Sequence, residues 1–184
     1  MGQDKAWLPF GPELMVQRVV RILSEVAQPI VIVAAELQDL PEVPAAVQIV
    51  RDRNRDRGPL EGICRGLEAL PISMEAAYVT ACDTPLLRPD FVRRVVGLLG
   101  EHDAAAPWIN GVYYPLAAVF RSRLLPTINH LLTRESNGPR RLLESIATRR
   151  IELAELSDID PELESLFNLN ESADYHNALL RAGL

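Results

Sequence analysis

The sequence predicts an α/β fold with a mostly parallel sheet and a late antiparallel hairpin. Segments with apolar residues at helical spacing alternate with short apolar runs, which is typical of a sheet covered by helices. The run at residues 30–34 has no polar residues between its apolar ones, as expected for a parallel strand buried on both faces. The chain has 184 residues, of which 48% are hydrophobic and 24% charged, and this favours one globular domain with a sizeable core.

The first half of the chain is predicted to run helix, strand, strand, helix, strand, helix. Pro12 suits the first turn of the opening helix, and Pro29 ends that helix. The apolar face of this helix recurs every three or four residues, at Val16, Val19, Val20, Leu23 and Val26. Apolar runs predict strands at 30–34, 47–50 and 76–81, and helical spacing predicts helices at 63–70 and 91–99.

The second half of the chain contains a strong turn signal. Asn110 and Gly111 separate apolar segments at 104–109 and 112–120, and this dipeptide is typical of a two-residue β-hairpin. The hairpin would either form an extra wall for a substrate or be a plain sheet edge. Further helices are predicted at 124–132, at 140–146 and from residue 171, and short strands at 151–153 and 166–169.

Composition excludes several classes of function. The net charge of -6 gives no overall basic footprint for nucleic acid. The two cysteines, Cys64 and Cys82, have no metal or redox spacing and favour a reducing compartment. No apolar run reaches the length of a membrane span, and no basic segment precedes an apolar core at the N-terminus. We therefore expect a cytoplasmic protein with no nucleic-acid or membrane partner.

Asp83 is the first candidate site residue. The strand predicted at 76–81 ends just before it, and Pro85 then breaks the extended structure because proline lacks an N–H group. Ligands bind at this edge of open α/β sheets, and a carboxylate there can hold a divalent metal against phosphate oxygens. The alternative is that Asp83 only stabilises a turn or caps a helix.

Three further polar residues are candidates. Lys5 is the only lysine among the 19 Lys and Arg residues of the chain. A lysine offers a compact point charge to a phosphate, so this single lysine indicates a phosphate site, with chance as the alternative. Asn168 and Asn170 are two residues apart and point the same way on a strand. They could cap or form turns, or contact a ribose or a metal-bound water.

Five short motifs carry a resemblance to one family. In order, they lie at residues 1–6 with 8–11, at Asp52 with 58–62, and at 82–85, 114–116 and 167–172. Together they resemble the ordered signatures of the molybdenum cofactor guanylyltransferases, which belong to the glycosyltransferase-A-like nucleotidyltransferases. The resemblance covers essentially the whole chain. The Gly-Pro-Leu-x-Gly loop favours the guanylyl branch over the cytidylyl and sugar-nucleotide branches.

The resemblance implies a Rossmann-like, three-layer nucleotidyltransferase fold, and it also implies a guanylyl-transfer reaction. GTP and molybdopterin bearing molybdenum would give the guanine dinucleotide cofactor and pyrophosphate, with Mg²⁺ as the metal. By motif position, Lys5 would contact the triphosphate, Asp83 would bind Mg²⁺, and both would be catalytic. Asn168 and Asn170 would lie near the metal or the incoming phosphate. The nucleoside would be held by Asp52, Gly58, Pro59, Leu60 and Gly62.

The chemistry is consistent with these residues. Attack of a phosphate on an α-phosphorus needs charge neutralisation and in-line positioning, and it needs no covalent nucleophile. The sequence has no convincing Ser/His/Asp or Cys/His arrangement. The alternatives are a related cytidylyl- or sugar-phosphate nucleotidyltransferase, or a catalytically silent nucleotide-binding protein that contacts proteins of cofactor assembly or cofactor acceptors.

The chain departs from the family pattern in two places. Relatives normally have a first strand and a Gly-rich, Arg-containing turn before the opening Met-Gly motif. We therefore expect residues 1–184 to be a single nucleotidyltransferase domain that lacks that strand and loop, with the true start of the protein upstream of Met1. The alternative is an open slot in the sheet, with residues 1–10 poorly anchored. The strand ending at Ala34 also lacks a polar residue often found there in relatives, and Ala35 and Glu36 follow it.

Overall fold

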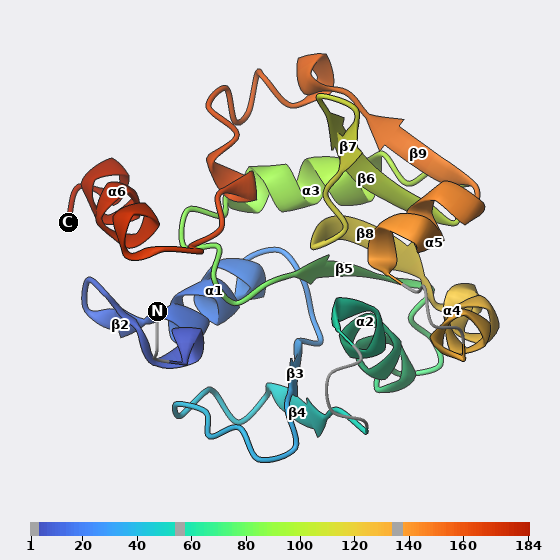
Figure 1. Cartoon of the computed structure of the whole chain (residues 1–184), viewed down its shortest axis with the longest axis horizontal. Coiled ribbons are helices and arrows are strands. Elements are labelled where there is room, and N and C mark those ends of the chain that lie inside the picture. The colour runs from blue at the N-terminus through green and yellow to red at the C-terminus, as the bar shows by residue number, and fades with distance from the viewer. Residues whose placement is uncertain (1–3, 54–57, 134–137) are drawn as a thin grey trace.

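The computed structural model describes residues 4–53, 58–133 and 138–184, which form three layers (Figure 1). One face of the central strands packs against the helices α2 (Pro59–Glu68), α4 (Leu125–Leu132) and α5 (Pro139–Ser145). The other face packs against α1 (Met15–Ser24) and α3 (Pro89–Gly97). Neighbouring residues of β6 (Ala104–Ile109) point to opposite faces, so that Ala104 and Ala106 join one core and Ala105 joins the other.

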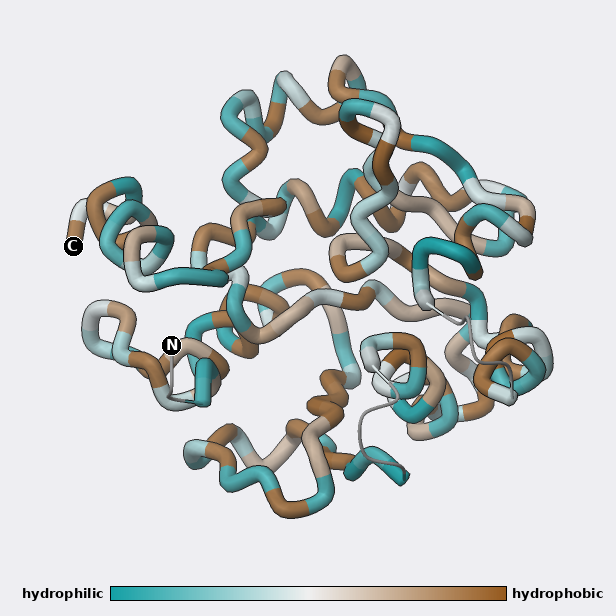
Figure 2. Tube along the Cα trace, in the orientation of Figure 1, coloured by the Kyte–Doolittle hydropathy of each residue, from teal (hydrophilic) through white to brown (hydrophobic). Residues whose placement is uncertain are grey.

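Along α6 (Ser172–Ala182), hydrophobic and hydrophilic residues alternate, as on a helix with one buried side (Figure 2).

The N-terminal segment is a short helical turn followed by a hairpin. The turn η1 spans Lys5–Trp7, and the strands β1 (Pro9–Phe10) and β2 (Glu13–Leu14) pair antiparallel. Gly11, at φ 64°, supplies the left-handed conformation that the hairpin turn requires. Helix α1 (Met15–Ser24) therefore begins after the hairpin, and the prediction that Pro12 lies in its first turn is wrong.

The next elements follow the predicted order. Strands β3 (Val31–Ala34) and β4 (Gln48–Arg51) pair in parallel, and they are followed by α2 (Pro59–Glu68), β5 (Ala76–Thr80) and α3 (Pro89–Gly97). Helix α2 begins earlier than predicted. Gly58, at φ 71°, is its N-cap and Pro59 its first residue, because proline has a helical φ and needs no N–H partner there. The segment 58–62 is therefore mainly the first turn of a helix.

The main sheet has five strands and is mixed. The hairpin prediction is confirmed for β6 (Ala104–Ile109) and β7 (Val112–Tyr113), with Asn110 at φ 52° and Gly111 at φ 78° in the turn. The chain then folds back as β8 (Ala117–Arg121), which pairs antiparallel with both β5 and β6. Strand β9 (Thr148–Ile151) pairs in parallel with β6. Among the described residues, four strand pairs are antiparallel and two parallel, so the prediction of a mostly parallel sheet holds only in part.

The strands of the described residues form separate sheets. There, β3 pairs only with β4, and β5 pairs only with β8. A cavity of about 270 Å³ is lined by residues of β3, α2 and β5, and its side chains are mostly apolar. The Tyr78 hydroxyl is buried without a hydrogen-bond partner in the part of the chain that the structure describes. Burial raises the pKa of Tyr78, so its hydroxyl stays neutral.

The C-terminal part is helical, with one long irregular stretch. It contains η2 (Ser122–Leu124), α4 (Leu125–Leu132), α5 (Pro139–Ser145), η3 (Leu153–Glu155), η4 (Glu164–Leu166) and α6 (Ser172–Ala182). The strand predicted at 151–153 lies three residues earlier, as β9. The strand predicted at 166–169 is wrong, because η4 ends at Leu166 and the chain then runs without strand pairing to α6. No helix of the described residues is long and apolar enough to span a bilayer.

Candidate active site

The structure brings Lys5 and Asp83 together. The Lys5 Nζ atom donates to Asp83 Oδ2 at 2.6 Å, although the two residues are 78 positions apart. Lys5 is held in η1, where the Asp4 side chain caps the turn by accepting from the Ala6 N–H at 3.0 Å. The Asp83 side chain is only 10% exposed, whereas that of Lys5 is 33% exposed. The two charges therefore form a fixed pair that remains open to solvent on the lysine side.

The turn after β5 holds Asp83 through its own backbone and through a distant segment. The Thr84 hydroxyl donates to the Ala81 carbonyl at 2.9 Å, and the Leu87 N–H donates to the Thr84 carbonyl at 3.2 Å. The Leu169 N–H donates to the Asp83 carbonyl at 3.1 Å. The turn of 83–87 and the segment of 167–170 are therefore joined directly.

Asn168 reaches the same carboxylate. Its Nδ2 atom lies 3.5 Å from Asp83 Oδ1, so Lys5 and Asn168 approach different oxygens of one side chain. Asn170 is fixed differently, because the Asp174 carboxylate accepts from the N–H groups of Asn170 and Glu171, each at 2.8 Å. These bonds lower the pKa of Asp174 and stabilise the start of α6.

A second cavity, of about 570 Å³, opens beside this pair of asparagines. It is bounded by the hairpin, by the start of α5, by the first residue of α2 and by the 166–170 segment. Its lining includes Tyr113, Tyr114, Leu116, Arg140, Phe167, Asn168 and Asn170. The cavity thus combines aromatic walls with one arginine and two amides. We call it the aromatic cavity.

The predicted nucleoside residues lie on another part of the structure. Asp52 follows β4, and its N–H donates to the Ala34 carbonyl at 2.9 Å. No hydrogen bond joins it to Lys5 or Asp83 among the described residues. Leu60 is fully buried in the core, so its side chain cannot line a ligand site. Gly62 lines the cavity beside β3, and Pro59 lines both cavities.

Asp52 and Glu61 form an acidic pair at the start of α2. Glu61 as a whole residue is 4% exposed, and its carboxylate accepts from the Arg53 N–H at 3.0 Å. Burial, and next the charge of Glu61, raises the pKa of Asp52 above its ordinary value of 3.8. The Asp52 Oδ1 atom is buried without a hydrogen-bond partner in residues 4–53, 58–133 and 138–184. A donor from a ligand would satisfy this oxygen.

The raised pKa predicts the pH dependence of an Asp52→Asn variant. The folded state binds the Asp52 proton more tightly than the unfolded state does, so the wild type loses stability as pH rises from 3.8 through the raised pKa. The neutral amide avoids this loss. We expect Asp52→Asn to have the higher free energy of unfolding at pH 7, and the difference to shrink toward pH 4. Urea unfolding at both pH values measures it, and a difference independent of pH would contradict it.

Neither cysteine is a suitable nucleophile. Burial raises the pKa of both Cys64 and Cys82 to about 11, and nearby carboxylates add to the effect. Both thiols are therefore protonated near neutral pH. Cys82 precedes Asp83 and packs against a small apolar cluster that contains Ala6, the residue after Lys5.

The donor set fits a metal that is bound mainly through a substrate. The described residues contain no group of three or more His, Cys, Asp or Glu side chains that could hold a metal ion. Mg²⁺ needs no such cage, because it commonly takes one or two carboxylates, several waters and the phosphate oxygens of a nucleotide. Asp83 supplies one carboxylate, and the amide of Asn168 could turn its oxygen to the same place. The site thus suits a metal that arrives with a triphosphate.

Sequence reasoning missed several residues of this region. Glu61 lies inside the 58–62 motif. An acidic residue directly before Gly62 could have indicated it as a site residue from the sequence. Tyr113 and Phe167 line the aromatic cavity, and no local pattern separates them from core aromatics. Arg18 lies on the helix face that the sequence assigns to solvent, yet it contacts the turn after Asp83. Of the motif residues, 1–3 lie outside the part of the chain that the structure describes.

Comparison with known proteins finds related sequences that match over most of this chain. Residues 1–152 match the family model described as MobA-like NTP transferase domain. A relative from Mycobacterium avium, named as a probable molybdenum cofactor guanylyltransferase, is 36% identical over 95% of this chain and 86% of its own.

Solved structures share the fold. The molybdopterin-guanine dinucleotide biosynthesis protein A of Archaeoglobus fulgidus matches with a TM-score of 0.81 at 19% identity, over 99% of this chain and 92% of that one. The 2-C-methyl-D-erythritol 4-phosphate cytidylyltransferase of Thermus thermophilus matches with a TM-score of 0.74 at 15% identity, over 100% and 95%. This chain therefore belongs to the MobA-like NTP transferase family, with molybdenum cofactor guanylyltransferases among its relatives, and is a nucleotidyltransferase.

Proposed function

We propose that this protein transfers GMP from GTP to molybdopterin bearing molybdenum, and that it uses Mg²⁺. The observation that carries the proposal is the meeting of Lys5, Asp83 and Asn168 beside the aromatic cavity. A cation, a carboxylate and an amide from three distant parts of the chain form the polar centre that phosphoryl transfer requires. The Mycobacterium avium relative is named as a probable guanylyltransferase, which supports the same class of transfer here.

The proposed reaction needs few chemical groups from the protein. A phosphate oxygen of the acceptor attacks the α-phosphorus of GTP, and the bond from that phosphorus to the bridging oxygen of pyrophosphate breaks. Lys5 donates to the oxygens of the triphosphate and offsets the charge that develops on the leaving group. Asp83, and Asn168 through its amide oxygen, would hold Mg²⁺. Bound Mg²⁺ supplies charge neutralisation and holds the phosphates in line.

The aromatic cavity is the proposed acceptor site. Its tyrosine and phenylalanine rings suit a flat heterocycle such as a pterin, and Arg140 offers a guanidinium to an anionic group. Pro59 borders both this cavity and the one beside β3, so an acceptor here would lie next to the segment proposed to hold the nucleoside.

Arg140→Ala tests the acceptor site. We expect the KM for molybdopterin to rise roughly tenfold, since hydrogen bonds to charged groups contribute about 1.5–3 kcal/mol, while the KM for GTP changes little. Arg141→Ala is the matched control, because Arg141 lies on the same helix and does not line the cavity. Steady-state kinetics with each substrate varied in turn measures both constants. An equal rise for the two variants would contradict the assignment.

Nucleotide choice is the finer part of the proposal. The fold alone does not select guanine, because a cytidylyltransferase shares it. The guanylyl assignment rests on the Gly-Pro-Leu-x-Gly motif and on the named relatives, and Asp52, Gly58, Pro59 and Gly62 are the residues proposed to hold the nucleoside. A thermal-shift panel of GTP, CTP, ATP and UTP with Mg²⁺ tests it. GTP is expected to give the largest rise in Tm, and a larger rise with CTP would favour the cytidylyl alternative.

Three broader expectations stay predictions. We infer that residues 1–184 act as one nucleotidyltransferase domain, that the protein works in the cytoplasm, and that it contacts proteins of molybdenum cofactor assembly or acceptor proteins. The catalytically silent alternative predicts GTP binding without formation of the dinucleotide.

A further inference from the structure

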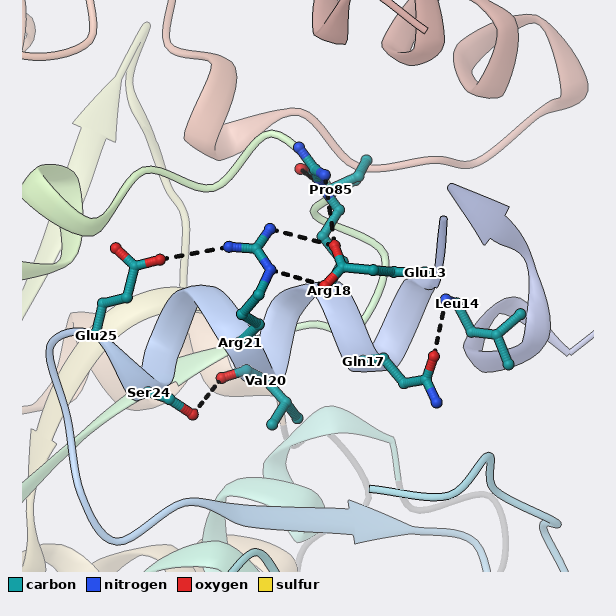
Figure 3. A network of polar contacts seen from close by, with 9 residues as sticks. All are labelled: Glu13, Leu14, Gln17, Arg18, Val20, Arg21, Ser24, Glu25 and Pro85. Carbon is teal, nitrogen blue, oxygen red and sulfur yellow. Dashed lines mark hydrogen bonds and ion pairs between the residues drawn. The ribbon is translucent and has the colours of Figure 1, made fainter. Parts of the chain in front are cut away.

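We propose that Arg18 is a positioning residue that fixes the turn carrying Asp83. The Arg18 Nε atom donates to the Pro85 carbonyl at 2.7 Å, which joins the middle of α1 to a point two residues after Asp83 (Figure 3). The two residues are 67 positions apart. This inference rests on the proposed function, in which Asp83 holds the metal.

Arg18 is itself held on several sides. Its guanidinium lies 4.7 Å from the centre of the Phe10 ring, and its Nη1 atom lies 3.7 Å from Glu13 Oε2. Arg21 binds the same Glu13 carboxylate, with contacts of 2.7 and 3.2 Å. The Arg18 side chain is only 21% exposed. A cation that is partly removed from water and stacked on a buried ring has few conformations, so it can fix the group to which it donates.

The partner of Arg18 belongs to the frame of the active site. Leu86, directly after Pro85, is buried in one apolar cluster with Phe10 and Leu169. Leu169 in turn donates its N–H to the Asp83 carbonyl. The turn of 83–87 is thus held at the Asp83 carbonyl, at the Pro85 carbonyl and at the Leu86 side chain. Of these three contacts, the one at the Pro85 carbonyl is made by the charged side chain of Arg18, so it is a charge-assisted hydrogen bond.

This arrangement predicts a specific defect when Arg18 is lost. Lys5 and Asn168 would still reach the Asp83 carboxylate. The turn of 83–87, however, would lose the hydrogen bond at the Pro85 carbonyl, which is one of the three contacts that hold it. Groups that orient a metal ligand without touching the metal typically change metal affinity by about 10- to 100-fold. We therefore expect metal affinity to fall with a smaller change in nucleotide affinity.

Arg21 provides a matched control. It shares Glu13 with Arg18 and lies one helical turn later, yet its contacts are with Glu13 and Glu25 and not with Pro85. Arg18→Met and Arg21→Met each remove one ion pair with Glu13. A purely structural role would therefore lower Tm in both variants. The positioning role would change the metal site in Arg18→Met alone.

The test is a Mn²⁺ titration followed by electron paramagnetic resonance, in the presence of α,β-methylene-GTP. We expect Arg18→Met to weaken Mn²⁺ binding about tenfold, Arg18→Lys to recover part of the loss, and Arg21→Met to stay within about twofold of wild type. Hydrogen exchange of the free protein should show faster exchange at residues 83–87 in Arg18→Met only.

The outcomes separate the two proposals. If the wild type binds Mn²⁺ and both methionine variants bind it equally well, the role of Arg18 is refuted while the proposed function stands. If the wild type binds no Mn²⁺ with the nucleotide analogue, the proposed function fails. Hydrogen exchange then still decides whether Arg18 orders the turn, and unchanged exchange at 83–87 would refute that as well.

Discussion

Asp83→Asn is expected to lower kcat for GMP transfer by about 10²- to 10³-fold while the fold persists. The amide keeps the shape of the side chain but loses the charge that would hold the metal. It also removes the ion pair with Lys5, whose Nζ atom lies 2.6 Å from the carboxylate. Because the Asp83 side chain is 10% exposed, water cannot replace the lost charge efficiently.

The measurement is kcat at saturating GTP and acceptor over a range of Mg²⁺ concentrations. Circular dichroism and Tm report whether the variant is folded. Asp90→Asn is a matched control, since Asp90 lies in the first turn of α3 on the protein surface, with its side chain 72% exposed. Near-normal turnover of Asp83→Asn would contradict the assignment of Asp83 as the metal ligand.

Lys5→Ala is expected to weaken GTP binding by roughly tenfold or more and GMP binding much less. The proposed partners of Lys5 are the distal phosphates, which GMP lacks, and a hydrogen bond between charged groups contributes about 1.5–3 kcal/mol. Lys5→Arg should recover only part of the affinity, because a planar fork does not reproduce a compact point charge.

Isothermal titration of each variant with GTP and with GMP, both with Mg²⁺, measures the two affinities. The informative quantity is the ratio of the GTP loss to the GMP loss. An equal loss for the two nucleotides would mean that Lys5 acts through the structure of the site. No loss for either would remove Lys5 from the nucleotide site.

Much of the site could be predicted because its residues follow local signals. Asp83 ends an apolar strand before a proline, and Lys5 is the only lysine in the chain. The structure places these two side chains in contact, and Asn168 beside them. The position of Asp83 at a strand end and the rarity of lysine can both be read from the sequence. The contact between Lys5 and Asp83, which are 78 positions apart, depends on the fold.

The sheet was predicted less well, for a physical reason. The local patterns of 76–81 and 104–109 correctly indicate strands, whereas the segment 112–120 divides into two strands, β7 and β8. None of these patterns carries information on the order of the strands in the sheet. Strand β8 enters between β5 and β6 and runs opposite to both, which follows from long-range pairing after the hairpin turn. The separation of β3 and β4 from the main sheet is likewise invisible in local periodicity.

Leu60 and Arg18 show that motif matches and hydrophobic periodicity do not predict which residues a side chain contacts. Leu60 lies in a motif assigned to the nucleoside, yet its side chain faces the core because Pro59 starts a helix there. Arg18 lies on the polar side of an amphipathic helix, where the default expectation is solvent. Its contacts with Pro85 and Phe10 depend on how α1 packs against the turn after β5.

The proposed transfer is tested most directly by an assay with α-³²P-labelled GTP, Mg²⁺ and molybdopterin bearing molybdenum, followed by separation of the products. Label is expected to move from GTP into the guanine dinucleotide cofactor, with pyrophosphate formed in equal amount. Both products are expected to be lost on chelation of the metal and in Asp83→Asn. Binding of GTP without any labelled dinucleotide, with active acceptor verified by a known guanylyltransferase, would contradict the proposed transfer.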